Sequence, residues 1–113
     1  MKLVALATMV AVIAVPAAGA ATGQLAGTVG PGFTITLKQG GKAVTALKAG
    51  TYTITVADKS KIHDFHLTGP GVNKKTAVGG LGTTTWTLTL KKGTYTYVCD
   101  PHASFMHGSF KVT

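Results

Sequence analysis

One cysteine, one histidine and one methionine fall within eight residues near the end of the chain, at Cys99, His102 and Met106. Thiolate and thioether sulfur are soft ligands, and the imidazole ring of histidine also suits copper. Copper sites that transfer electrons use two histidines and one cysteine in a trigonal set, with a weak axial methionine. This segment supplies three of the four ligands, so a second histidine must come from elsewhere in the chain.

The segment upstream that offers the second histidine is an expected strand over 62–68, which contains His63 and His66. In a strand, His63 shares one face with Phe65 and Leu67, whereas His66 lies on the other face. If Phe65 and Leu67 face the core, His63 points inward, where a ligand is needed. We therefore predict His63 rather than His66 as the fourth metal ligand.

The first twenty residues have the order of an export signal. Lys2 is followed by the apolar run Leu3 to Val15, which is too short to span a bilayer, and by an A-x-A site ending at Ala20. We predict a signal peptide over 1–20, a mature domain over 21–113, and a periplasmic or extracellular protein after cleavage; a retained anchor is the alternative. Because cysteines usually pair in an oxidising compartment, the single cysteine calls for a functional explanation.

The rest of the chain is typical of an all-β fold. Short segments rich in Thr, Val and Tyr alternate polar and apolar residues, and turns containing Gly and Pro separate them. A chain of 113 residues allows one domain. About eight strands are expected, which favours a β-sandwich: 24–29, 32–38, 43–47, 51–57, 62–68, 84–90, 94–99 and 108–113.

Two turns share one pattern. Leu-Lys-Ala-Gly-Thr-Tyr over 47–52 is matched by Leu-Lys-Lys-Gly-Thr-Tyr over 90–95. Each places a tyrosine two residues after the turn glycine, at a strand start. This spacing predicts tyrosine corners at Tyr52 and Tyr95, in which the hydroxyl reaches back to the preceding backbone.

The ligand segment also resembles a known family. It reads Cys-x-Pro-His-x-x-x-Met-x-Gly over 99–108, preceded by Gly-Thr-Tyr-x-Tyr-x-Cys, and it is similar to the cupredoxins, which include plastocyanin, azurin and amicyanin. The resemblance covers essentially the whole mature chain and implies a cupredoxin-like Greek-key sandwich. It also implies one type 1 (blue) copper ion that cycles between Cu(I) and Cu(II). The upstream ligand of that family lies in a His-Asn pair, which matches the position of His63 and again selects it.

Two departures from the family pattern concern residues beside the ligands. The family usually has Asn after the first histidine and Ser or Thr after the cysteine, whereas this chain has Asp64 and Asp100. In relatives these side chains help to tie the two ligand segments together. Two close carboxylates would repel each other unless they shared a proton or recruited a lysine or a water.

The resemblance implies that His102 is the ligand whose ring edge reaches solvent within an apolar patch. Our candidates for that patch are Pro31, Pro70, Pro101, Ala103 and Phe105. Such a patch suits brief docking to a redox partner.

The charge balance bears on the partner. Eleven lysines face three aspartates, with no arginine and no glutamate, for a formal net charge of +8. Nucleic acid is disfavoured, because no arginine is available to read bases and the lysines are scattered. The basic charge favours either a redox partner with an acidic docking surface or, as the alternative, a solvated surface whose charge is incidental; an anionic membrane surface is a weaker candidate. We also expect the protein to be a monomer.

The function that these features favour is the shuttling of single electrons between redox partners, without enzymatic activity. The main alternative is copper delivery or storage with the same ligands. A non-redox β-sandwich binding module is a further alternative, disfavoured because all four ligand types are present. A catalytic copper domain is disfavoured because the sequence offers one mononuclear site.

Overall fold

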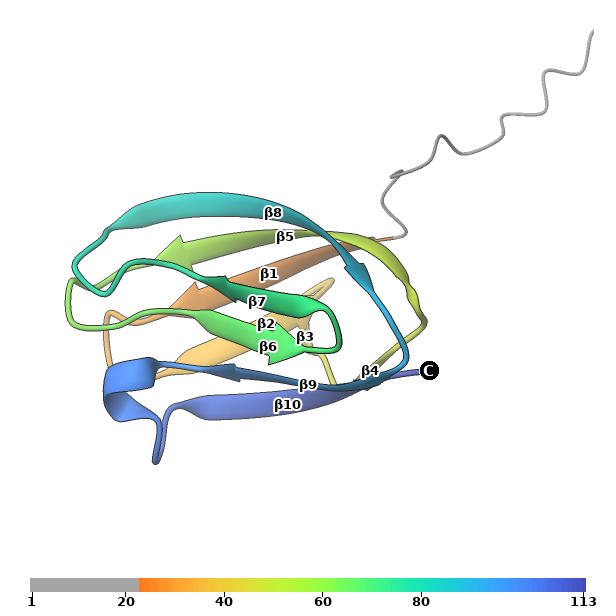
Figure 1. The fold of residues 1–113 in the computed structure, drawn as a ribbon. Helices are drawn as coiled ribbons and strands as arrows, with labels where there is room; N and C mark the ends of the chain where they lie inside the picture. Colours follow the sequence, from red (N-terminus) through yellow and green to blue (C-terminus); the bar gives the residue numbers. More distant parts are fainter. Residues whose placement is uncertain (1–22) are drawn as a thin grey trace, which may run out of the picture.

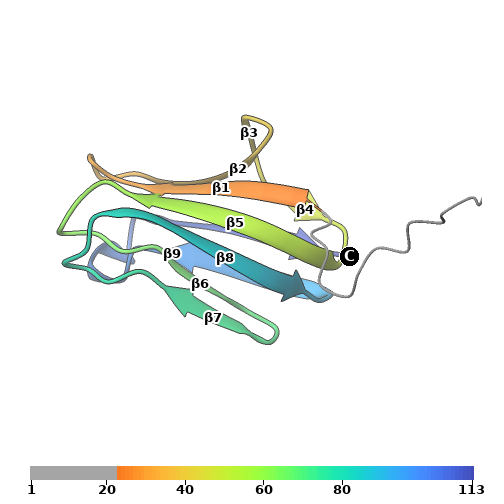
Figure 2. The same cartoon turned by 90° about the horizontal axis from the view of Figure 1, so that it is seen from above.

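The computed structural model describes residues 23–113, so the predicted signal peptide over 1–20 lies outside the described residues. Two five-stranded sheets pack as the layers of a sandwich, in the orders β3-β2-β1-β5-β8 and β4-β10-β9-β6-β7 (Figures 1 and 2). No helix in the described part of the chain is long and apolar enough to cross a membrane. The elements are β1 (Gly23–Val29), β2 (Ile35–Gln39), β3 (Lys42–Ala43), β4 (Ala46–Leu47), β5 (Gly50–Asp58), β6 (His66–Gly69), β7 (Val72–Lys75), β8 (Gly82–Leu90), β9 (Gly93–Val98), the 3-10 turn η1 (Asp100–His102) and β10 (His107–Val112).

The predicted all-β sandwich is confirmed, with three differences in its strands. The strand expected over 43–47 is two short strands, β3 and β4, which belong to different sheets. Of the strand expected over 62–68, only the part in β6 forms, and the residues before β6 form a connection. The polar strand β7 was not predicted, because three of its four residues are Asn or Lys and lack the alternation of a half-buried strand.

Alternation along β5 shows how the sequence builds the core. Tyr52, Ile54 and Val56 are buried, whereas the threonines between them face outward. β5 lies between β1, which it pairs in parallel, and β8, which it pairs antiparallel, so both of its edges are hydrogen-bonded within the sheet. The C-terminal ends of β5 and β9 lie at the same end of the molecule (Figure 1).

Both predicted tyrosine corners are confirmed. The Tyr52 hydroxyl donates to the Lys48 carbonyl at 2.7 Å. The Tyr95 hydroxyl accepts from the Lys91 N–H at 2.8 Å and donates to the Pro70 carbonyl at 3.0 Å. The second corner therefore fixes the start of β9 against the β6–β7 hairpin, at the end of the sandwich away from Cys99.

A stacked aromatic pair lies beneath the other end. The rings of Phe65 and Tyr97 are 5.7 Å apart and nearly parallel. Phe65 comes two residues after His63, and Tyr97 two residues before Cys99. Gly108 lies against the same tyrosine, and a Cβ at that position would collide with the Tyr97 ring. Close packing thus explains the glycine of the ligand motif and ties the two ligand segments to one core.

Candidate metal centre

Four connections, β1–β2, β5–β6, β7–β8 and β9–β10, gather at the end of the sandwich opposite the C-terminus (Figure 1). The β9–β10 connection carries three predicted ligands and is closed by its own backbone hydrogen bonds. Cys99 N–H donates to the Met106 carbonyl at 3.0 Å, and Met106 N–H donates to the His102 carbonyl at 2.9 Å. Cys99 and Met106 therefore lie side by side at the base of a fixed turn.

The structure brings His63, Cys99 and His102 together. The two histidine Nδ1 atoms are 3.1 Å apart, and the Cys99 sulfur lies 3.6 Å from the first and 3.5 Å from the second. A single point lies about 2 Å from all three atoms, close to the bond lengths of about 2.0–2.1 Å to nitrogen and 2.3 Å to sulfur that metals such as zinc show in proteins. Donor types and spacing fit the trigonal His₂Cys set that copper uses.

Burial supports a preformed site. His63 and Cys99 are fully buried, and Met106 is 1 % exposed. The second ring nitrogen of His63, Nε2, is buried without a hydrogen-bond partner among the described residues. Nδ1 is therefore the His63 nitrogen that faces other polar groups and is available to a metal. The ligand set His63, Cys99, His102 and Met106 remains a prediction, which the experiments below address.

The prediction that His63 lies on a strand was wrong. Residues 62–65 are not a strand, and His63, Asp64 and Phe65 are buried in succession, whereas Ile62 is 53 % exposed. His63 nevertheless points inward, because the connection folds over the end of the sandwich. His66 lies outside the three-atom cluster.

Both ring nitrogens of His66 have other partners. Nδ1 forms an ion pair with Asp100 at 2.9 Å, and Nε2 lies 2.6 Å from the side-chain oxygen of Asn73. Burial alone would lower the pKa of His66, but its hydrogen bonds with Asp100 and Asn73 raise that pKa above its ordinary value. His66 therefore pairs with Asp100 and Asn73 and not with the ligand cluster.

The two unusual aspartates are also in contact. Asp100 N–H donates to the buried Asp64 carboxyl at 2.6 Å. Burial, and next the hydrogen bond with the Asp100 carboxyl, raise the pKa of Asp64 to about 6. The pKa of Asp100 is lowered, chiefly by its hydrogen bond with the Asp64 carboxyl and also by His66. The repulsion expected from the sequence is relieved by the hydrogen bond between the two carboxyls and by His66, and Lys75 also lowers the pKa of Asp100.

The two ligand segments also affect the pKa of the Cys99 thiol. Burial raises the pKa of Cys99, while the backbone N–H groups of Asp64 and His102 oppose that shift. The metal-free protein therefore holds a protonated thiol at neutral pH, and a metal must displace that proton to bind the sulfur.

An exposed apolar patch surrounds the half-buried ring of His102. The rings of Phe33 and Phe105 lie 5.1 Å and 5.6 Å from it, and these phenylalanines are 58 % and 59 % exposed. Phe33 was not predicted for this patch, although a phenylalanine beside the Gly-Pro-Gly turn was an available signal. The prediction for Pro70 was wrong, because it packs against Gly93 at the opposite end of β9.

Comparisons with known proteins agree with this geometry. Residues 28–113 match the family of copper binding proteins of the plastocyanin/azurin type. Solved structures of the copper protein rusticyanin share the fold, each with 80 % of this chain and 76 % of the other covered. One is 22 % identical with a TM-score of 0.60, a second is 26 % identical with 0.58, and one from Thiobacillus ferrooxidans is 25 % identical with 0.55. A search of curated proteins finds no match. The family match over most of the chain and the shared fold together show that the chain belongs to the cupredoxins, the plastocyanin/azurin family of copper-binding proteins.

Proposed function

We propose that this cupredoxin carries single electrons through one type 1 copper ion held by His63, Cys99, His102 and Met106, and that it is a carrier rather than an enzyme. The observation that supports this is the trio of ligand atoms already within 3.6 Å of one another in the metal-free chain. The copper ion would supply the Cu(I)/Cu(II) couple. The chain's task is to hold its ligands in nearly the same places in both states.

The protein's own contacts fit that task. The backbone bonds of the Cys99–Met106 turn and the Phe65–Tyr97 stack limit the movement of both ligand segments. Of the four predicted ligands only His102 is not buried, and exposed Phe33 and Phe105 border its ring, so His102 offers a route from the site to a partner. A small apolar surface of this kind suits weak, brief encounters between redox proteins.

We further propose that the partner presents an acidic surface. All ten lysines of the described residues are exposed, and none forms an ion pair with a carboxylate there. Asp58 and Asp64 are buried, and Asp100 is paired with His66. The positive charge is therefore available to attract an acidic protein.

The test is to add Cu(II) to the purified protein and to record its visible spectrum. We expect an intense thiolate-to-copper absorption that is lost in Cys99→Ser and retained in His66→Ala. A band that persists in His63→Ala would remove His63 from the ligand set. Voltammetry then separates the two functions: a reversible one-electron wave supports electron transfer, whereas redox-inactive copper that passes readily to a chelator supports delivery or storage.

We also propose that the protein is exported after removal of residues 1–20. The order of charged, apolar and small residues in this segment supports the proposal. Mass spectrometry of the protein made by cells that carry the full gene should give the mass of residues 21–113; the mass of the whole chain in a membrane fraction would instead support a retained anchor.

A further inference from the structure

The connection that carries His63 has no strand pairing of its own. It runs from Lys59 to Phe65 between β5 and β6. The other three predicted ligands lie on the separate β9–β10 connection. The position of His63 relative to them therefore depends on whatever fixes this connection.

A buried carboxylate fixes its beginning. Asp58, the last residue of β5, is 5 % exposed and has no ion pair among the described residues. One of its oxygens, Oδ1, accepts the Ser60 N–H at 3.1 Å. Ser60 in turn accepts the Ile62 N–H with its hydroxyl at 3.3 Å, and its carbonyl faces the His63 N–H at 3.5 Å. The turn that leads into His63 thus starts from Asp58.

Thr76, which follows β7, fixes the end of the connection. Its hydroxyl accepts the Phe65 N–H at 2.9 Å, and its own N–H donates to the Phe65 carbonyl at 3.1 Å. Both the N–H and the carbonyl of Phe65 are therefore hydrogen-bonded to Thr76. Phe65 lies two residues after His63 and also stacks on Tyr97, so its place bears directly on the site.

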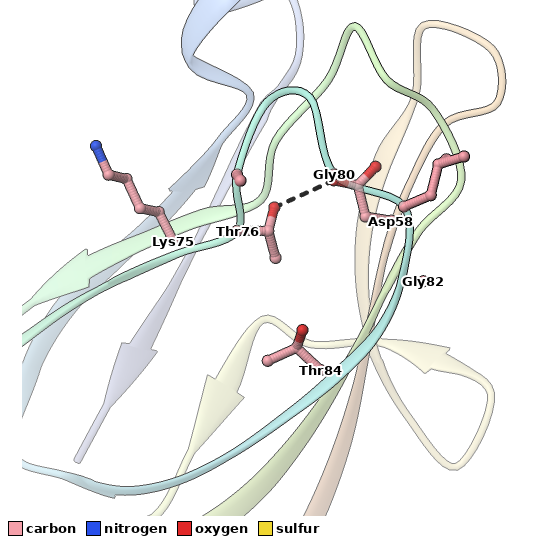
Figure 3. Close-up of a pocket in the computed structure, with 8 residues that line it drawn as sticks. Asp58, Lys75, Thr76, Gly80, Gly82 and Thr84 are labelled. Atoms are coloured by element: carbon pink, nitrogen blue, oxygen red, sulfur yellow. Dashed lines mark hydrogen bonds between the residues drawn. The ribbon is translucent and has the colours of Figure 1, made fainter.

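The two anchors are joined to each other. The Thr76 hydroxyl donates to Asp58 Oδ2 at 3.3 Å. Figure 3 shows this bond at the edge of a pocket of about 270 Å³, with Lys75 pointing away from the carboxylate. A hydroxyl that donates to a carboxylate becomes a better acceptor, so the bond to Asp58 strengthens the bond from Phe65. One carboxylate therefore links both ends of the segment that carries His63, and it acts beside two further bonds of this segment, Lys59 N–H to the Val29 carbonyl at 2.9 Å and Asp100 N–H to Asp64 at 2.6 Å.

We propose that Asp58 and Thr76 are positioning residues of the metal centre, which set the place of His63 through Ser60 and Phe65. This inference rests on the proposed role of His63 as a ligand. Neither residue belongs to the ligand motif. Such supporting contacts commonly change metal affinity by about 10- to 100-fold when they are removed.

Thr76→Val tests the proposal, because it keeps the shape of the side chain and removes the hydroxyl. Thr84→Val is the matched control: Thr84 lines the same pocket from β8, is exposed, and forms no side-chain hydrogen bond found among the described residues (Figure 3). Thr76→Ser restores the hydroxyl and should restore the wild-type behaviour. Asp58→Asn is the second variant if Thr76→Val does not fold.

The first measurement needs no metal. In the apoprotein, hydrogen exchange at the Phe65 amide should accelerate roughly tenfold in Thr76→Val, the order expected for one lost buried hydrogen bond. Asp58→Asn should accelerate exchange at Ser60 and Phe65. Exchange in Thr76→Ser and Thr84→Val should match wild type. If the Phe65 amide exchanged at the same rate in Thr76→Val as in wild type, the proposal would be overturned.

The second measurement uses copper. Thr76→Val should bind Cu(II) about 10- to 100-fold more weakly and shift the visible band, while Thr84→Val should do neither. If wild type shows the thiolate band and Thr76→Val behaves like Thr84→Val, the positioning role fails and the proposed function stands. If wild type shows no band, the proposed function itself fails.

Discussion

The backbone N–H of Asp100 donates to the buried carboxyl of Asp64 at 2.6 Å, so the residues that directly follow Cys99 and His63 are bonded to each other. This bond joins the two connections that carry the predicted ligands. It also places two carboxyl groups and His66 in one network, whose proton content must change with pH. The metal-free protein should therefore have an unusual stability profile.

We expect the free energy of unfolding of the apoprotein to fall as pH rises from about 4 to about 8. The pKa of Asp64 is raised from 3.8 to about 6, so its contribution is full below 3.8 and is lost as pH rises through 6. The pKa of His66 is raised from 6.5, so its contribution to the free energy of unfolding is full below pH 6.5 and is lost as pH rises through the raised pKa of the folded state. The pKa of Asp100 is lowered from 3.8, so its contribution to the free energy of unfolding is full above pH 3.8 and is lost only as pH falls below that value.

Urea denaturation under reducing conditions, repeated across this pH range, measures the effect. The loss from Asp64 should be on the order of 2 kcal/mol. Asp64→Asn should flatten the profile below about pH 7, and His66→Gln should flatten it above about pH 6. Stability that rises with pH between these limits would contradict the assigned network.

The packing of Gly108 leads to a second prediction. Gly108→Ala should destabilise the protein by about 1–3 kcal/mol, because the new methyl group would collide with the Tyr97 ring and force it away from Phe65. Gly32→Ala is the control, since a Cβ there meets no atom within 4 Å. Thermal unfolding of both apoprotein variants gives the comparison. Equal melting temperatures would mean that the Tyr97 ring can move at no cost.

The local features of the site could be read from the sequence, and the features that depend on distant segments could not. Cys99, His102 and Met106 belong to one turn, so their spacing was sufficient. The inward orientation of His63 was predicted through a strand that does not form there, and the burial of Asp64 contradicts that strand. No feature of the sequence indicated a role for Thr76. It meets Phe65 across eleven residues, and no periodicity encodes a hydrogen bond between two connections.

Pro101 provides a prediction about the reduction potential. Cys99 is the N-cap of η1, and its side chain forms no cap hydrogen bond with the turn. The second residue is Pro101, which has no N–H. Pro101→Ala supplies one more donor to the sulfur, which should favour the reduced site and raise the potential by about 20–60 mV.

Voltammetry of the copper-loaded proteins tests this. Pro101→Ser should raise the potential to a similar extent, because the effect depends on the backbone N–H and not on the new side chain. A reduction potential that is unchanged or lower in both variants would contradict this prediction.

The exposed lysines give a prediction about electron-transfer rates with small charged reagents. Because the lysines are unpaired in the described residues, an anionic inorganic oxidant should react with the reduced copper protein faster at low salt, and its rate should fall as ionic strength rises. A cationic oxidant should show the opposite trend. Lys61→Glu lies on the β5–β6 connection, at the same end of the sandwich as His102, and should slow the anionic reagent more than Lys92→Glu, which lies in the β8–β9 turn at the other end. Both variants change the net charge equally, so equal slowing would mean that the electron does not leave through the patch around His102.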